Sequence, residues 1–272
     1  MELPTWIPQI SLRWTKKTPK EVLRFMMDME RKDPHKRIAF TNDEKRIKAY
    51  TEICKIPYEK AVNYTTVGCN EPAFQGSIAG STSKGNLLHS IETLFHKKHE
   101  KIANCNDFEE FYSQYLTILF EELDKIFEYD DMYNSLRAKD TNYISSLFAS
   151  DCIENAKSVT AGGSNIGIAS PMLMGTVNVI DSLIAVKQFV FDEKIFTMSA
   201  LIDALHKNWQ GYEDMRVLIL KKCEFFGNDT ELSCSVAKRL FADIYAHIKD
   251  RKNIFGYQWL LGDLAGYNQH YK

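Results

Sequence analysis

The stretch "NYTTVGCNEPAFQGSIAGSTSKGN", residues 63–86, places Cys69 and Glu71 two positions apart in a segment rich in glycine, serine and threonine. The Asn, Gly and Pro around them favour a turn, with a strand entering through "YTTV". In an extended backbone, residues 69 and 71 project to the same side, so a thiol and a carboxyl group could address one small ligand. Such a pair suits hydrogen abstraction or nucleophilic attack at sulfur, assisted by proton transfer at the carboxyl group. Spacing alone favours a simpler interpretation, a buried cysteine beside a glutamate that caps a loop.

The composition is that of a soluble globular protein and excludes several function classes. The chain has 272 residues, 44% of them hydrophobic, and 34 Lys+Arg against 36 Asp+Glu give a net charge of -2. No overall field would therefore gather nucleic acid or an anionic membrane. The N-terminal segment lacks the pattern of a signal peptide, and no segment approaches the roughly 18 apolar residues of a membrane helix. We expect a cytoplasmic protein.

The six cysteines are scattered and form no CxxC pair, which argues against a disulfide framework and a zinc knuckle. Most of them are expected to be small buried hydrophobic residues.

Helical spacing of apolar residues dominates the chain, so the expected fold class is a helix-rich α/β protein with few, short strands. "QISLRW" alternates apolar with polar residues and should be extended. Thr18, Pro19 and Glu21 form a capping box that predicts the start of a helix, and Asn42 should cap the next. No composition shift marks a domain boundary. Further helices are predicted at 43–53, 57–64, 86–103, 108–133, 146–157, 176–191, 197–209, 212–226 and 235–250.

Other constellations are weaker. His96 and His99 would share a helix face and could hold a metal ion, but no acidic or thiol partner stands at motif spacing, so a solvated charged face is the better explanation. "GGSNIG", residues 162–167, has neither GxGxxG spacing nor a Walker GK[ST] and does not indicate a nucleotide site. "STSK", residues 81–84, lacks SxxK order. We therefore expect no bound metal or cofactor.

Five stretches together resemble the glycyl radical enzyme family, which is pyruvate formate-lyase-like. "NDE" at 42–44 resembles the family's segment ahead of the active-site loop, and "VGCNEP" resembles its G-C-x-E-P signature. "GGSN" resembles its glycine-rich turn. The remaining two matches are "DSLIAVKQFVFDEK" at 181–194 and "ALHKNWQGYEDMR" followed by "FGNDT".

The resemblance implies a site and a mechanism. Cys69 would carry a transient thiyl radical and Glu71 would be the neighbouring acid or base. A backbone glycyl radical draws hydrogen from Cys69, the thiyl takes hydrogen from substrate, the substrate radical fragments or eliminates, and the cysteine recovers its hydrogen from product. In the family a ten-stranded α/β barrel encloses this loop, and the chain would contribute part of that barrel.

The resemblance also implies cofactors and partners. A SAM- and iron-sulfur-dependent activating enzyme would install the glycyl radical, and the complete enzyme would be a homodimer acting on a small molecule. The G-C-x-E pattern resembles the dehydratase, choline lyase and decarboxylase branches more than pyruvate formate-lyase itself, and Asn70 leans toward decarboxylases or an uncharacterised branch. Substrate contacts stay open, with His89, His96 and Asp203 as guesses.

Members of the family are much longer, and their radical glycine lies in a segment resembling R-V-x-G-Y. "LAGYN", residues 264–268, lacks the arginine. We therefore expect residues 1–272 to be the central part of a pyruvate formate-lyase-like domain, without the C-terminal glycine radical domain, which a second chain could carry. The alternatives are a noncatalytic remnant or binding module with the same fold, and a helical scaffold with an accidental motif.

Overall fold

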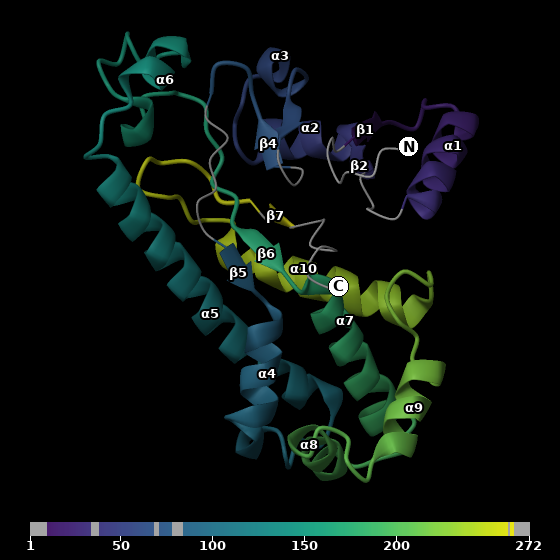
Figure 1. Ribbon diagram of the computed structural model, residues 1–272. Helices are drawn as coiled ribbons and strands as arrows, with labels where there is room; N and C mark the ends of the chain where they lie inside the picture. The colour runs from purple at the N-terminus through teal and green to yellow at the C-terminus, as the bar shows by residue number, and fades with distance from the viewer. Residues whose placement is uncertain (1–9, 34–37, 68–70, 78–83, 261, 264–272) are drawn as a thin grey trace. The chain divides into compact units, whose positions relative to one another are not determined.

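The computed structural model describes residues 10–33, 38–67, 71–77, 84–260 and 262–263 (Figure 1). The chain forms two compact units. The first contains residues 1–82, 130–172 and 250–272, and the second contains residues 83–129 and 173–249. Because the chain passes back and forth between the units, no single linker separates them. This is why no composition shift marks a boundary.

The first unit begins with a parallel β-α-β element. Strands β1 and β2 pair in parallel from Ile10 opposite Ile38 to Trp14 opposite Asn42, and α1 connects them. Strand β2 was not predicted from the sequence. The bounds in this unit are β1 Ile10–Trp14, α1 Lys20–Lys32, β2 Ile38–Asn42, α2 Asp43–Glu52, α3 Tyr58–Ala61, β3 Thr65–Val67, β4 Glu71–Ala73, α6 Tyr143–Phe148, a 3-10 turn Val159–Ala161 and β7 Gly262–Asp263.

Two sequence-based predictions in this unit are wrong. The capping box at Thr18 does not form, because the Thr18 Oγ1 accepts a hydrogen bond from the Thr15 backbone N–H at 2.9 Å, and Pro19 stands at the cap of α1 without a side-chain bond. The helix expected at 146–157 ends at Phe148, since Asp151 and Ala156 adopt positive φ angles of 70° and 48° that no α-helix continues through.

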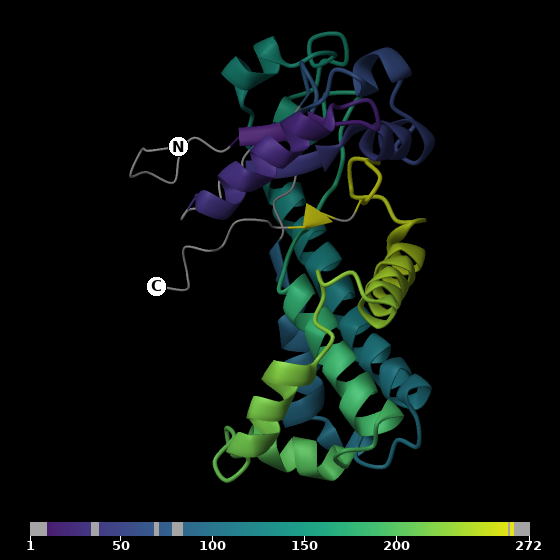
Figure 2. The same cartoon turned by 90° about the vertical axis from the view of Figure 1, so that its right-hand side faces the viewer.

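The second unit is helical. Helix α7 packs against α4 and α10, and Figure 2 shows α7 in green beside the blue ribbon of α4. Ile180, Leu183 and Leu240 are fully buried in this packing. Within the described residues, none of the helices combines the length and the apolar character needed to cross a bilayer. The bounds are β5 Lys84–Asn86, α4 Leu88–His96, a 3-10 turn His99–Lys101, α5 Phe108–Arg137 (shared with the first unit beyond Tyr129), β6 Met172–Met174 (of which Met172 belongs to the first unit), α7 Thr176–Ala185, a π-helical continuation Val186–Asp192, α8 Met198–His206, α9 Glu213–Lys222 and α10 Glu231–Ile248.

Helix α6 exposes its large apolar side chains, namely Tyr143, Ile144, Leu147 and Phe148. An exposed cluster of this size on one short helix is typical of a contact surface. We expect the isolated chain to associate at tens of micromolar, and the double variant Ile144→Ser with Phe148→Ser to associate less. Sedimentation velocity measures both. A monodisperse monomer of the unaltered chain would contradict this expectation.

Candidate active site

The segment around Glu71 is a β-hairpin in the first unit. Strands β3 and β4 pair antiparallel, with Thr65 opposite Ala73 and Val67 opposite Glu71. The strand predicted through "YTTV" is therefore confirmed. Cys69 belongs to the three-residue connection 68–70 and lies outside the described residues, so its orientation relative to Glu71 stays a prediction.

Glu71 carries a carboxylate oxygen that is buried without a partner. Its Oε2 is inaccessible to water and accepts no hydrogen bond within the part of the chain that the structure describes. A buried acceptor without a partner costs about 1–3 kcal/mol, and more when it is charged, so such groups are uncommon in folded proteins. Among the described residues, this oxygen therefore does not cap a loop, because a capping carboxylate oxygen accepts backbone N–H groups.

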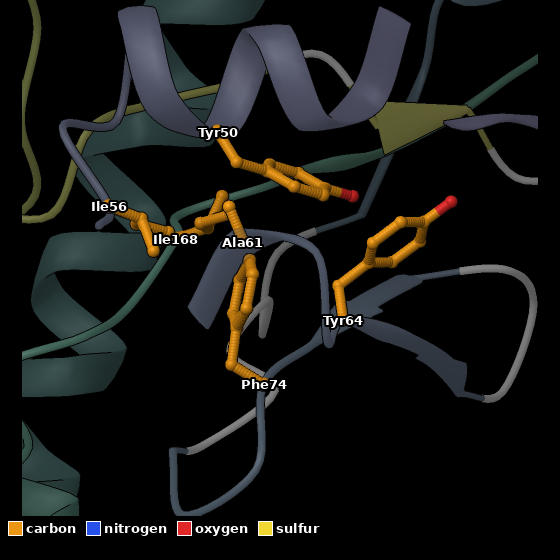
Figure 3. Packing of buried hydrophobic residues seen from close by; sticks show 6 residues of the cluster. All are labelled: Tyr50, Ile56, Ala61, Tyr64, Phe74 and Ile168. Atoms are coloured by element: carbon orange, nitrogen blue, oxygen red, sulfur yellow. The ribbon is translucent and has the colours of Figure 1, made fainter. Parts of the chain in front are cut away.

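An aromatic cluster holds both ends of the hairpin (Figure 3). Tyr64 directly precedes β3 and Phe74 directly follows β4, and both are buried. The ring of Tyr50, on α2, meets both of them edge to face, at 5.2 Å from Tyr64 and 5.1 Å from Phe74 between centroids. Ile56, Ala61 and Ile168 complete the same cluster. The two strands that lead into and out of the connection 68–70 are therefore anchored in a packed core.

A polar network ties the hairpin to the β-α-β element. Arg13, on β1, binds Asp43 with both prongs of its guanidinium, Nε to Oδ1 at 2.7 Å and Nη2 to Oδ2 at 2.9 Å. The same guanidinium donates to the carbonyls of Tyr64 at 2.8 Å and Val62 at 2.9 Å, and it lies 4.1 Å from the centre of the Tyr64 ring. Tyr64 in turn donates its hydroxyl to Asp43 Oδ1 at 2.6 Å. These contacts hold Tyr64 in place, and Tyr64 directly precedes the β3–β4 hairpin.

The ionisation of this network follows from its contacts. Burial alone would raise the pKa of Asp43, but the hydrogen bonds from Arg13 and Tyr64 outweigh it and lower that pKa below its ordinary value. Burial, with the hydrogen bond to Asp43, raises the pKa of the Tyr64 hydroxyl. The network therefore holds a charged Arg13–Asp43 pair and a neutral tyrosine at neutral pH.

The "NDE" motif is thereby explained residue by residue. Asn42 caps α2 as predicted, since its Oδ1 accepts from the Lys45 N–H at 3.0 Å. Asp43 joins the network with Arg13, and Glu44 Oε1 accepts from the Lys16 N–H at 3.4 Å. The motif is structural support for the hairpin.

The glycine-rich turn also supports the hairpin core, through Ile168. Gly163 is required by packing, because an added Cβ would lie 2.1 Å from the Lys157 carbonyl oxygen. Asn155 donates to the Gly163 carbonyl at 2.8 Å, and Asn165 donates its N–H to Asp151 at 3.1 Å. A loop was predicted here, and its polar groups are used internally.

The histidine pair predicted to share a helix face does not. Helix α4 ends at His96, and His99 begins the 3-10 turn after it. Both rings instead contact His206, His96 stacked at 5.2 Å and His99 edge-on at 5.0 Å. In the described ranges, no group of three or more potential ligands has the geometry of a metal site.

Two of the residues considered as substrate contacts, His89 and Asp203, are helical residues of the second unit. His89 is exposed on α4. Asp203 on α8 is paired with Lys207 at 2.8 Å and with the Tyr212 hydroxyl at 2.5 Å. Both belong to the second unit, whereas Glu71 belongs to the first.

Of the five described cysteines, all are free thiols, and Cys152 and Cys223 are buried. Cys54 packs partly buried against the hairpin core, where burial raises its thiol pKa to about 12. A thiol with such a pKa is inert at neutral pH.

The family model described as pyruvate formate lyase-like matches residues 1–265. The chain belongs to this family of glycyl radical enzymes. It is 26% identical to trans-4-hydroxy-L-proline dehydratase from Clostridioides difficile over 92% of this chain and 33% of that protein. It is 28% identical to isethionate sulfite-lyase from Bilophila wadsworthia (strain 3_1_6) over 73% of this chain and 26% of that protein.

The solved structures agree on the fold. The glycerol-bound B12-independent glycerol dehydratase from Clostridium butyricum superposes with a TM-score of 0.76 at 25% identity, covering 94% of this chain and 34% of that one. The chain thus spans about a third of the length of these relatives. The relatives are lyases and dehydratases of the glycyl radical class.

The roles of Arg13, Tyr50 and Tyr64 were not predicted from the sequence. They carry no local motif, since Arg13 meets a partner 30 residues away. The one available signal was the "NDE" resemblance, whose central aspartate had no assigned partner.

The Arg13–Asp43–Tyr64 network yields a stability prediction. Replacing Asp43 with asparagine removes the charge that pairs with Arg13, and we expect the free energy of unfolding in urea to fall by about 2–3 kcal/mol. Glu52→Gln, on the same helix, breaks an exposed pair with Lys48 and should change it by less than about 0.5 kcal/mol. Equal effects of the two variants would contradict the role given to Asp43.

The same network predicts a pH dependence. Because the folded-state pKa of Asp43 is lowered, its contribution is present above the unfolded-state pKa of about 3.9 and is lost as the pH falls through the folded value. The difference in the free energy of unfolding between the unaltered chain and Asp43→Asn should therefore shrink below about pH 4, as urea unfolding at a series of pH values would measure.

Proposed function

We propose that this chain is the thiol-bearing part of a glycyl radical lyase, with Cys69 as the residue that exchanges hydrogen with substrate and Glu71 as its acid or base. The observation that carries the proposal is the buried Glu71 Oε2 without a partner among the described residues, two positions from Cys69. Membership of the family supplies the chemistry for such a pair. The anchored hairpin supplies the rigidity that a reacting geometry needs.

Cys69 would exchange one hydrogen atom in each direction. Its S–H bond breaks to form a thiyl, the thiyl takes one hydrogen atom from a substrate carbon, and the re-formed S–H bond returns one hydrogen atom to the product radical. The glycyl radical, when present, supplies the one-electron oxidation of the thiol. A segment resembling R-V-x-G-Y would carry it, and a SAM- and iron-sulfur-dependent activating enzyme would install it.

Glu71 would move a proton rather than a hydrogen atom. As a base it takes the proton of a substrate hydroxyl, and as an acid it gives a proton to a departing oxygen, so that the leaving group departs as a stable molecule. A carboxyl group with an unpaired oxygen can do both without first breaking a hydrogen bond. Its burial keeps bulk water from competing.

The relatives point to elimination as the reaction type. Their names denote dehydration of trans-4-hydroxy-L-proline and release of sulfite from isethionate. We propose that the substrate is a small hydroxylated compound that loses water or sulfite. We therefore favour elimination over the decarboxylation that Asn70 suggested.

The enclosing architecture is part of the proposal. The parallel β1-α1-β2 element and the β3-β4 hairpin would be one portion of a ten-stranded α/β barrel with the cysteine loop inside. Further sequence would complete it, and the complete enzyme would be a homodimer. TM-scores of 0.76 to 0.78 against radical dehydratases support this arrangement.

The test is an anoxic turnover assay with the chain supplied with a glycyl radical domain and activating enzyme. Vicinal diols, trans-4-hydroxy-L-proline and hydroxyalkyl sulfonates are offered, and aldehyde, pyrroline and sulfite are measured. We expect one class to be consumed. A glycyl radical doublet in the electron paramagnetic resonance spectrum without product from any class would favour the noncatalytic binding module instead.

A further inference from the structure

The second unit contains a pocket whose lining residues do not include Glu71 or its hairpin. Helices α4, α7, α8 and α9 line it, and its volume is about 440 Å³. This volume lies in the range of small-molecule sites. Its walls belong entirely to the second unit.

The walls are aromatic and aliphatic. Phe95, Phe196, Trp209 and Phe225 are among the lining residues. Trp209 is held in a left-handed backbone conformation with φ 67°, which is an outlier for a bulky residue and costs of order 1–3 kcal/mol. Strain of this kind is concentrated at binding and catalytic sites.

The charged groups that line the pocket are acidic. Asp181 and Glu92 both contribute to the lining, and no lysine or arginine does among the described residues. Asp181 uses one oxygen to accept the Phe226 N–H at 2.8 Å. In the described part of the chain, neither carboxylate forms an ion pair. His96 is the one basic side chain among the described lining residues.

We propose that this pocket binds an organic cation with an apolar body, an alkyl or aryl ammonium whose charge sits at Asp181 and Glu92 and whose body lies on the aromatic wall. Aromatic faces attract cations as well as apolar groups, and unpaired carboxylates supply the directional contact. A free amine and a lysine side chain in a peptide share this chemistry. The proposal does not depend on radical chemistry at Cys69.

Binding of three matched probes to the 272-residue chain tests the proposal. The three probes, phenylpropylamine, phenylpropanol and phenylpropionate, have the same ring and differ in charge. A peptide in which leucines flank a lysine is the second kind of probe. Calorimetry measures affinity, and fluorine spectra of fluorotryptophan-labelled protein, assigned with Trp209→Phe, report occupancy. We expect the affinity for the amine to exceed the affinity for the alcohol by about ten-fold or more, and the affinity for the carboxylate to be the lowest of the three.

Two variants locate the charge contact. Asp181→Asn keeps the acceptor for the Phe226 N–H. It should lower the affinity for the amine about ten-fold without changing the affinity for the alcohol, and Glu92→Gln should also lower the affinity for the amine. Glu100→Gln removes the same charge next to α4 but outside the pocket, and should change nothing. Equal affinity for amine and alcohol, or an Asp181→Asn and a Glu92→Gln protein that both bind the amine unchanged, would overturn the proposal. Preference for the peptide over the amine would assign the cation to a protein side chain.

Discussion

Replacing Cys69 with serine should abolish turnover, by at least about 10³-fold, in the chain supplied with a glycyl radical domain. An O–H bond is too strong to exchange hydrogen with a carbon radical, so serine keeps the shape and loses the chemistry. The glycyl radical doublet should remain, because its formation does not require the thiol. Product formation and electron paramagnetic resonance on the same sample measure both effects.

The control for Cys69→Ser is Cys54→Ala. Cys54 also belongs to the first unit, but it packs against the hairpin core and its thiol pKa is raised by burial to about 12. Its removal should leave turnover within a few-fold of the unaltered protein. A Cys69→Ser protein as active as Cys54→Ala would rule out thiyl chemistry at position 69.

Replacing Glu71 with glutamine should lower kcat by about 10²–10⁴-fold, since the amide can neither accept nor release a proton. Glu71→Asp keeps the carboxyl group but withdraws it, and should fall between glutamine and the unaltered protein. Substrate affinity should change much less than kcat. Steady-state kinetics across a pH series separate the two.

Replacing Glu71 should not lower stability, although it should lower kcat. Because Oε2 of Glu71 is buried without a partner in the described chain, Glu71→Met should leave the free energy of unfolding unchanged or raise it by about 1 kcal/mol. Glu52→Gln provides the exposed reference. A structural glutamate would behave differently, with Glu71→Met unfolding more easily and Glu71→Gln keeping full activity.

Much of the fold could be predicted from local pattern. The long helices follow apolar periodicity, and the strand through "YTTV" and the cap at Asn42 have local signals. Strand β2, "IAFTN", has no clear alternation, and the strand that it pairs with, β1, lies 28 positions earlier in register. The capping box at Thr18 failed because the hydroxyl binds the Thr15 N–H instead.

The motif residues of the site could be predicted from the sequence, but the contacts that support them could not. The Cys-x-Glu spacing and the family motifs identify the hairpin, but its supports are contacts distant in sequence, such as Tyr64 with Asp43 across 21 residues. Motifs in the second unit have structural roles as well. Asp181 of "DSLIAVKQ" holds the Phe226 N–H, and Tyr212 of "GYE" holds Asp203.

The proposed chemistry requires that Cys69 and Glu71 face one cavity closed to bulk water. A crystal structure of the reduced protein, grown without oxygen, would give the positions of Sγ and Oε2. We expect both atoms on the same side of the backbone, about 7 Å apart or less, with no channel to solvent. Side chains on opposite faces, or a sulfur open to bulk water, would contradict it.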